Sequence, residues 1–137
     1  MQVREVMTQN PASVAADTNV IDVARLMKER DIGDVIVMKD GQLCGIVTDR
    51  DIVVRALAEH RDISNTPIDQ ICSRHLFTIS PNHSVDEAIK MMREHSVRRL
   101  PVVENDRVVG VLSIGDLAVE RDPGSALGQI SAAPPNR

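Results

Sequence analysis

Aromatic residues are nearly absent from this chain of 137 residues, which has no Trp, no Tyr and a single Phe, Phe77. Proteins that bind single-stranded nucleic acid stack the bases on aromatic side chains, and this chain has almost no rings to offer. A sugar-binding groove lined with aromatic rings is excluded for the same reason. The core must therefore be built from aliphatic side chains and six Met, which the hydrophobic content of 42% allows.

Other absences narrow the class of protein further. Sixteen Lys and Arg against twenty Asp and Glu give a net charge of −4, without the basic excess that marks proteins binding duplex DNA. No apolar run approaches the ~20 residues of a membrane-spanning helix, and residues 1–10 lack the apolar stretch of a signal peptide. Two cysteines, Cys44 and Cys72, are too few for a disulfide scaffold. We therefore expect a cytoplasmic protein that binds neither nucleic acid nor membranes.

Metal binding and catalysis have little support in the sequence. The segment Cys72-Ser-Arg-His75 suggests metal ligands, but a structural zinc site needs a second ligand pair at a matching spacing. The four His are scattered along the chain, and no nucleophile has a base close to it in sequence. We therefore expect no metal site and no enzymatic activity.

The two halves of the chain carry one pattern twice. With an offset of 65, residues 3–54 align with residues 68–119 without a gap. Apolar positions fall on apolar positions almost throughout, and Gly45 falls on Gly110. A repeat of this length indicates one supersecondary unit that is present in two copies.

Both copies predict the element order β-α-β-β-α. Apolar residues recur at the i, i+3, i+4, i+7 spacing of a half-buried helix, and turn residues separate the two strands that follow. The first copy predicts strands at 12–15, 35–38 and 43–48 and helices at 20–27 and 49–59; the second predicts strands at 76–80, 100–104 and 108–112 and helices at 85–92 and 115–120. The predicted fold class is therefore α/β, with a first repeat at 1–64, a second at 65–121 and a flexible C-terminal tail at 122–137.

The junction between the last strand and the last helix has the same pattern in both copies. Thr48 precedes Asp51 by three residues, as Ser113 precedes Asp116, and each hydroxyl residue follows an aligned glycine by three positions. One explanation is structural, because a hydroxyl and an acid at this spacing cap a helix. The other is nucleotide binding, because a helix N-terminus holds phosphate, an aspartate accepts hydrogen bonds from ribose hydroxyls, and the glycine lets a ligand approach the strand backbone. Both explanations stay open at this point.

Three features of the chain resemble paired cystathionine β-synthase (CBS) domains, the Bateman module. They are these two junctions, the segment Ser-Val-x-x-Ala at 84–88 and the segment Arg99-Leu-Pro-Val-Val103. The resemblance covers residues 3–120. It implies two repeats related by pseudo-twofold symmetry, with their sheets packed together, helices outside and two clefts between the repeats. Many such modules bind AMP, ADP, ATP or S-adenosyl ligands, regulate an enzyme or channel, and pair into dimers through their helices.

The resemblance also implies which residues bind the nucleotide. Thr48 and Ser113 match the hydroxyl on the phosphate or ribose side, and Asp51 and Asp116 match the acid that binds ribose. The residues that match the strands around the adenine pocket are Val14, Val37, Ile79 and Val102. A purine would then lie between aliphatic side chains, with Phe77 as the one ring able to stack on it.

The phosphate end of the implied site is uneven between the two copies. The basic residues at positions that bind phosphate in similar modules are Arg50, Arg98 and Arg99. The first copy has Gly33 and Asp34 where the second has its two arginines. We expect the cleft that combines Asp51 with these arginines to favour a phosphorylated ligand, whereas Asp34 works against phosphate in the other cleft, where Arg50 can offset it. The alternative is that the two arginines are solvated surface residues.

Three hypotheses on function follow. The first is a regulatory module that is a homodimer and needs no cofactor. It binds AMP, ADP or ATP in preference to S-adenosylmethionine and signals to an unknown target protein in trans. The second is a structural scaffold for dimerisation or interaction, with empty clefts. The third is an enzyme such as inosine monophosphate dehydrogenase, in which similar modules occur; it is excluded because the repeat leaves no room for a catalytic barrel.

Overall fold

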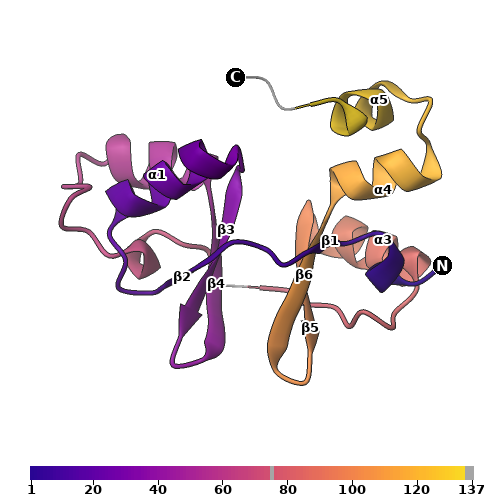
Figure 1. The fold of residues 1–137 in the computed structure, drawn as a ribbon, viewed down its shortest axis with the longest axis horizontal. Coiled ribbons are helices and arrows are strands. Elements are labelled where there is room, and N and C mark those ends of the chain that lie inside the picture. Colours follow the sequence, from indigo (N-terminus) through magenta and orange to yellow (C-terminus); the bar gives the residue numbers. More distant parts are fainter. Residues whose placement is uncertain (75, 135–137) are drawn as a thin grey trace. The chain divides into compact units, whose positions relative to one another are not determined.

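The computed structural model describes residues 1–74 and 76–134 and consists of two compact units (Figure 1). The first-repeat unit comprises Ala12–Leu76, and the second-repeat unit comprises Met1–Pro11 together with the chain from Phe77 onward. Each unit has a three-stranded sheet, and helices lie against each sheet. The predicted α/β class is confirmed.

The first-repeat unit contains strands β2 (Ser13–Ala15), β3 (Asp34–Lys39) and β4 (Gln42–Thr48), in the order β2-β3-β4. Strand β2 is parallel to β3, and β3 is antiparallel to β4. Helix α1 (Val20–Arg30) precedes β3. The one-turn helix α2 (Asp49–Asp51) follows β4 and continues directly as the π-helix η2 (Ile52–Leu57). The short 3-10 helix η3 (Ile68–Gln70) comes last. The predicted elements of the first copy are thus all present, within a few residues of their expected bounds.

The second-repeat unit repeats the antiparallel strand pair and the preceding helix of the first. Its sheet has the order β1-β6-β5, from strands β1 (Thr8–Gln9), β5 (Arg99–Glu104) and β6 (Arg107–Ser113). The predicted strand at 76–80 is wrong, because within this segment only Ile79 pairs, by one bridge to Val102, and the N-terminal segment supplies the third strand of the sheet. The helices of this unit are η1 (Val3–Glu5), α3 (Val85–His95), α4 (Ile114–Arg121) and α5 (Ala126–Ala132). Helices α1 and α3, strands β3 and β5, and strands β4 and β6 are each 65 residues apart at both ends, so the offset found in the sequence also relates the two structures.

The cores consist of the apolar stripes that the sequence predicted. Helix α1 buries Val20, Val23 and Met27, and α3 buries Val85, Ala88 and Met92 at the equivalent positions. The strands, the other helices and the exchanged chain segments supply the remaining core residues. Each unit therefore has a hydrophobic core of its own.

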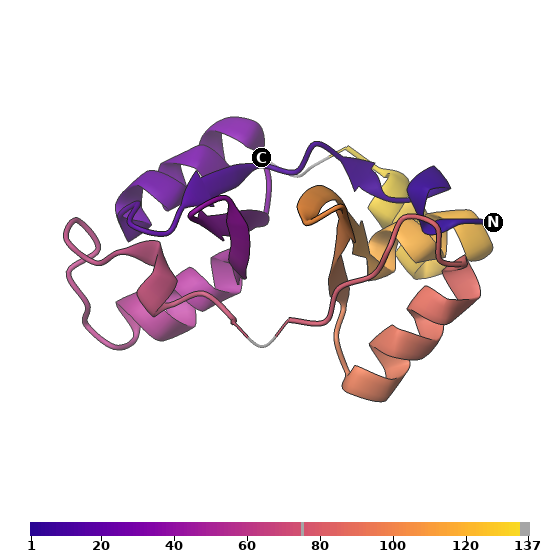
Figure 2. The same ribbon diagram turned by 90° about the horizontal axis from the view of Figure 1, so that it is seen from below.

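The two repeats exchange their first segments. Strand β1 belongs to the first repeat but pairs with β6 of the second, with Thr8 opposite Val111 and Gln9 opposite Gly110. Conversely, Ser73 belongs to the second repeat and pairs with Ile46 in β4 of the first. Figures 1 and 2 both show the N-terminal segment, in indigo, running beside β6. The compact units therefore divide the chain differently from the predicted repeats at 1–64 and 65–121, because backbone pairing carries each first segment to the other repeat.

This exchange explains the aligned glycines. A Cβ atom at Gly45 would lie 2.6 Å from the carbonyl oxygen of Ser73, and one at Gly110 would lie 2.8 Å from that of Thr8. Both distances are far below van der Waals contact, so only glycine lets the exchanged segment pass this close. The predicted reason, close approach of a ligand to the strand, is wrong at these positions, because the protein's own backbone takes the space.

The C-terminal segment differs from the prediction of a tail without regular structure. Helix α5 lies at Ala126–Ala132, where the Ser125 hydroxyl accepts a hydrogen bond from the Gly128 N–H at 3.0 Å. The helix packs on α4. It is too short to show a periodic pattern, so the contact with α4 stabilises it rather than an apolar stripe. The end of the predicted tail, 135–137, lies outside the described residues.

None of the helices in the described part of the chain combines the length and apolar character that crossing a membrane requires.

The close approach at Gly110 yields a stability test. Replacing Gly110 by Ala places a methyl group against the Thr8 carbonyl, and we expect this overpacking to cost about 1–3 kcal/mol. The melting temperature, followed by far-ultraviolet circular dichroism, should fall by several degrees. Gly124→Ala is the matched control, because no atom lies within 4 Å of a Cβ at Gly124. Equal melting temperatures for the two variants would contradict this account of Gly110.

Candidate functional site

The junction between β4 and α2 is closed by a reciprocal pair of hydrogen bonds. The Thr48 hydroxyl accepts a hydrogen bond from the Asp51 N–H at 3.1 Å, and Asp51 Oδ2 accepts one from the Thr48 N–H at 2.9 Å. This arrangement is a capping box, which satisfies backbone donors that the first helical turn leaves unpaired. The structural explanation of the motif therefore holds for the first copy.

The junction between β6 and α4 has the same geometry. The Ser113 hydroxyl accepts from the Asp116 N–H at 3.1 Å, and Asp116 Oδ2 accepts from the Ser113 N–H at 2.9 Å. In both copies the cap uses only one oxygen of the carboxylate. The cap therefore uses Oδ2 of each aspartate and leaves Oδ1 outside the capping box. The surroundings of Oδ1 differ between the two junctions.

Oδ1 of Asp51 lies 3.7 Å from Nε of Arg55, one helical turn further along the chain. The Asp51 side chain is only 14% exposed, so this cation lies beside a largely desolvated carboxylate. At the position equivalent to Arg55, the second copy has Glu120 on α4. Because residues four apart lie on one helical face, Asp116 has an acidic neighbour where Asp51 has a basic one.

The strands place the predicted phosphate-binding positions beside these junctions. In the second-repeat unit Arg99 pairs with Ser113, and the carbonyl of Arg98 accepts a hydrogen bond from the Ile114 N–H at 2.9 Å. In the first-repeat unit Asp34 occupies the position of Arg99 and pairs with Thr48. The structure thus brings both arginines next to the hydroxyl of their own repeat. Their predicted combination with Asp51 stays a prediction.

Arg50, the third predicted phosphate-binding residue, lies on the exposed side of the first junction. Its backbone N–H donates a hydrogen bond to Asp49 Oδ1 at 2.8 Å, and its side chain is exposed to solvent. It is therefore close in sequence to the capping box, without a part in it.

The predicted adenine-pocket residues lie on paired strands. Val14 is opposite Val37 in the sheet of the first-repeat unit, and Ile79 bridges to Val102 at the equivalent position of the second. Val37 and Val102 are 0% exposed and Ile79 is 3% exposed, so these three side chains belong to the two cores. Val14 is half-buried and packs against the first core. Their contact with a purine stays a prediction.

Phe77, the single aromatic residue, stacks on His95 with ring centroids 3.8 Å apart and an interplanar angle of 11°. The imidazole covers one face of the phenyl ring, and the Phe77 residue stays 39% exposed. The two residues are far apart in sequence and no local pattern joins them, so this contact could not be predicted from the sequence.

Within residues 1–74 and 76–134 there is no cluster of three or more His, Cys, Asp or Glu side chains that could hold a metal ion. His75, the last residue of the segment that suggested metal binding, lies outside the described residues.

Known proteins match the chain along most of its length. A family model for the CBS domain matches residues 3–58 and 68–121. The CBS domain-containing protein YhcV of Bacillus subtilis (strain 168) is 38% identical over 133 residues, covering 94% of each chain. A solved structure of a protein with CBS domains from Burkholderia ambifaria MC40-6 has a TM-score of 0.79 and 28% identity, covering 88% of this chain and 93% of that one. The CBS domain pair of protein MJ0100, in complex with 5′-methylthioadenosine and S-adenosyl-L-methionine, also has a TM-score of 0.79, covering 91% and 98% of the two chains; at 23% identity this likeness concerns the fold alone.

The capping boxes can be tested through stability. Replacing Ser113 by Ala removes the acceptor of the Asp116 N–H, and we expect the free energy of unfolding to fall by about 1 kcal/mol. Urea unfolding followed by circular dichroism measures the change. Ser64→Ala, at an exposed position between the repeats, is the control and should have no effect. If both variants were equally stable, the Ser113 hydroxyl would not be what holds the start of α4.

Proposed function

Because the chain belongs to the CBS domain family, we propose that it is a regulatory module that binds an adenosine-type nucleotide at its strand-to-helix junctions. The observation that carries the proposal is the duplicated junction, in which the cap uses Oδ2 of each aspartate. Oδ1 is thereby held at the surface of a helix N-terminus, where it can accept a hydrogen bond from a ribose hydroxyl. The fold supports the choice of ligand, since the MJ0100 pair binds two adenosine-containing molecules on it.

The two junctions differ in what a ribose must displace. At Asp51, a ribose hydroxyl competes with the Arg55 guanidinium for Oδ1. At Asp116, Glu120 offers no such competitor. We therefore propose that the Asp116 junction binds ribose more tightly. Arg98 and Arg99, which are predicted to act together with Asp51, would favour AMP, ADP or ATP over uncharged nucleosides.

A nucleotide regulates only if it binds two conformations with different affinities. The module would then act in the cytoplasm on a target protein in trans, as a homodimer. Self-association is supported by exposed apolar side chains on η2, where Val53 and Leu57 are each 55% exposed. The same side chains favour the second candidate function, a dimerisation scaffold that carries no ligand.

Nucleotide binding is tested first with the protein as purified. Because the chain has no Trp and no Tyr, an absorption band near 260 nm reports a co-purified nucleotide, which mass spectrometry after denaturation identifies. Titration with AMP, ADP, ATP and S-adenosylmethionine at millimolar concentrations should raise the melting temperature, because a ligand that binds only the native state stabilises it. If none of the four raised it, the ligand-free scaffold would be the better description.

The site assignment is tested by replacing Asp51 and Asp116 with Asn. The amide oxygen of Asn still accepts the capping hydrogen bond, while its NH₂ group cannot accept one from ribose. We expect the affinity, measured by calorimetry, to fall about tenfold or more, because a hydrogen bond to a charged group is lost. Asp86→Asn, on the exposed surface of α3, is the matched control. Unchanged affinity in the double variant would rule out these two residues as the ribose site.

A further inference from the structure

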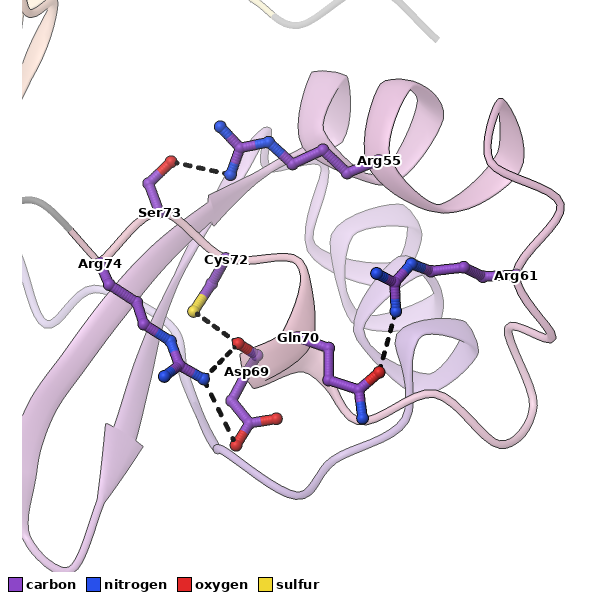
Figure 3. A pocket seen from close by; sticks show the side chains of 7 residues that line it. All are labelled: Arg55, Arg61, Asp69, Gln70, Cys72, Ser73 and Arg74. Atoms are coloured by element: carbon purple, nitrogen blue, oxygen red, sulfur yellow. Dashed lines mark hydrogen bonds and ion pairs between the residues drawn. The ribbon is translucent and has the colours of Figure 1, made fainter.

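An open pocket of about 650 Å3 lies within the first-repeat unit, between η2 and the segment around η3. We call it the arginine pocket; it is lined by Arg55, Arg61, Arg74, Asp69, Gln70, Cys72 and Ser73 (Figure 3). Its volume is that of a small-molecule site.

Each guanidinium group in the arginine pocket is held in place by a hydrogen bond. Arg55 Nη1 donates to the Ser73 hydroxyl at 3.2 Å, Arg61 Nη1 donates to Gln70 Oε1 at 2.9 Å, and Arg74 Nη2 donates to the Asp69 carbonyl at 2.7 Å. Figure 3 shows Arg55 and Arg61 reaching from η2 and the chain that follows it toward the segment around η3, while Arg74 extends from that segment itself. Three cations are thereby gathered in spite of their mutual repulsion.

These hydrogen bonds leave donors for a ligand. A guanidinium group has five N–H donors, and among the residues that the structure describes, each of the three groups donates through only one terminal nitrogen. The side chains of Arg55 and Arg74 are 47% and 60% exposed. Nε of Arg55 lies beside Asp51 Oδ1, and Arg74 interacts with the Cys72 thiol. Each guanidinium group still has N–H donors beyond these contacts, which can face an anion that enters the pocket.

The balance of charge in the arginine pocket is positive, although the whole chain carries −4. The lining contains three guanidinium groups and one carboxylate, Asp69, whose Oδ2 lies 3.8 Å from Arg74 Nη2. Asp51, next to the pocket, partly offsets Arg55. Burial, together with the neighbouring Cys44, raises the pKa of the Cys72 thiol above its ordinary value, so Cys72 stays neutral at pH 7 and adds no negative charge.

The fold itself does not require these arginines, as the second copy shows. At the positions equivalent to Arg55 and Arg74 the second-repeat unit has Glu120 and Gln9. That unit builds the equivalent antiparallel pair of strands, β5 with β6, and the same capping box without them. The cluster is therefore a feature of one copy, and structural need does not account for it.

We propose that the arginine pocket binds a compact anion with several negative charges, of the pyrophosphate class. Planar guanidinium groups match phosphate oxygens in pairs of hydrogen bonds, and three such groups lining one pocket suit an ion with two phosphate groups. The site is distinct from the proposed ribose contacts at Asp51 and Asp116, although Arg55 takes part in an ion pair with Asp51.

The test is calorimetric titration of the full chain with sodium pyrophosphate in chloride buffer of low ionic strength at pH 7.5. We expect saturable binding at one site, and a loss of about tenfold or more in the variant that combines Arg61→Gln and Arg74→Gln. Arg25→Gln is the matched control, because Arg25 is an exposed arginine that also pairs with an aspartate. Circular dichroism melting of each variant confirms that it is folded, and the two single variants replace the double one if it is not.

The outcomes separate this proposal from the nucleotide site. Retained pyrophosphate binding in the variant with Asp51→Asn and Asp116→Asn supports a separate site, even if nucleotide binding were absent altogether. Absence of binding to the unaltered chain would overturn the proposal. An equal loss in Arg25→Gln would also overturn it, because general attraction of anions would then explain the heat. The anion would lie at the capping boxes instead if pyrophosphate binding were lost in the variant with Asp51→Asn and Asp116→Asn but fully retained in the variant with Arg61→Gln and Arg74→Gln.

Discussion

The structure depends on the backbone pairing of two exchanged segments with β4 and β6. Each segment passes over a strand at a glycine, where the approach to Gly45 and Gly110 leaves no room for a Cβ atom. Without this contact each sheet would lose residues that pair with its edge, and each core would lose side chains such as Val3 and Ile68, which are fully buried. The strand-to-helix junctions are positioned by the ends of these same two strands, so the candidate site rests on the exchange as well.

At the junctions, structural and functional roles fall on the same residues and are compatible. A capping box fixes the aspartate and aims one oxygen at the backbone, which holds the other oxygen in a defined direction. The repeat provides an internal comparison of what surrounds that oxygen. At the first junction Asp51 forms an ion pair with Arg55, whereas at the second junction Asp116 is followed one helical turn later by Glu120. The hydrogen bonds of the two caps nevertheless have equal lengths.

Local patterns predicted the fold well, and long-range contacts escaped prediction. The helical stripes and the offset of 65 are visible in the sequence, because periodicity and repetition depend on neighbouring residues. The exchange of segments is not, since an alignment assigns residues 3–9 to the repeat they precede. The same limit applies to Phe77 against His95 and to Arg61 and Arg74, whose common pocket depends on how the chain folds back. Helix α5 escaped because its contact with α4, rather than its composition, stabilises it.

The exchange has a consequence for the order in which the chain can fold. The first-repeat unit is continuous, Ala12–Leu76, while the second-repeat unit is interrupted by it and joins Met1–Pro11 to the chain from Phe77 onward. During synthesis the strands of the first-repeat unit are complete at Thr48, and the whole unit is complete once Leu76 has left the ribosome. The N-terminal segment, made first, must wait for β6, and closing that long loop costs entropy that grows only slowly with its length. The chain is, in topological terms, one domain inserted into another.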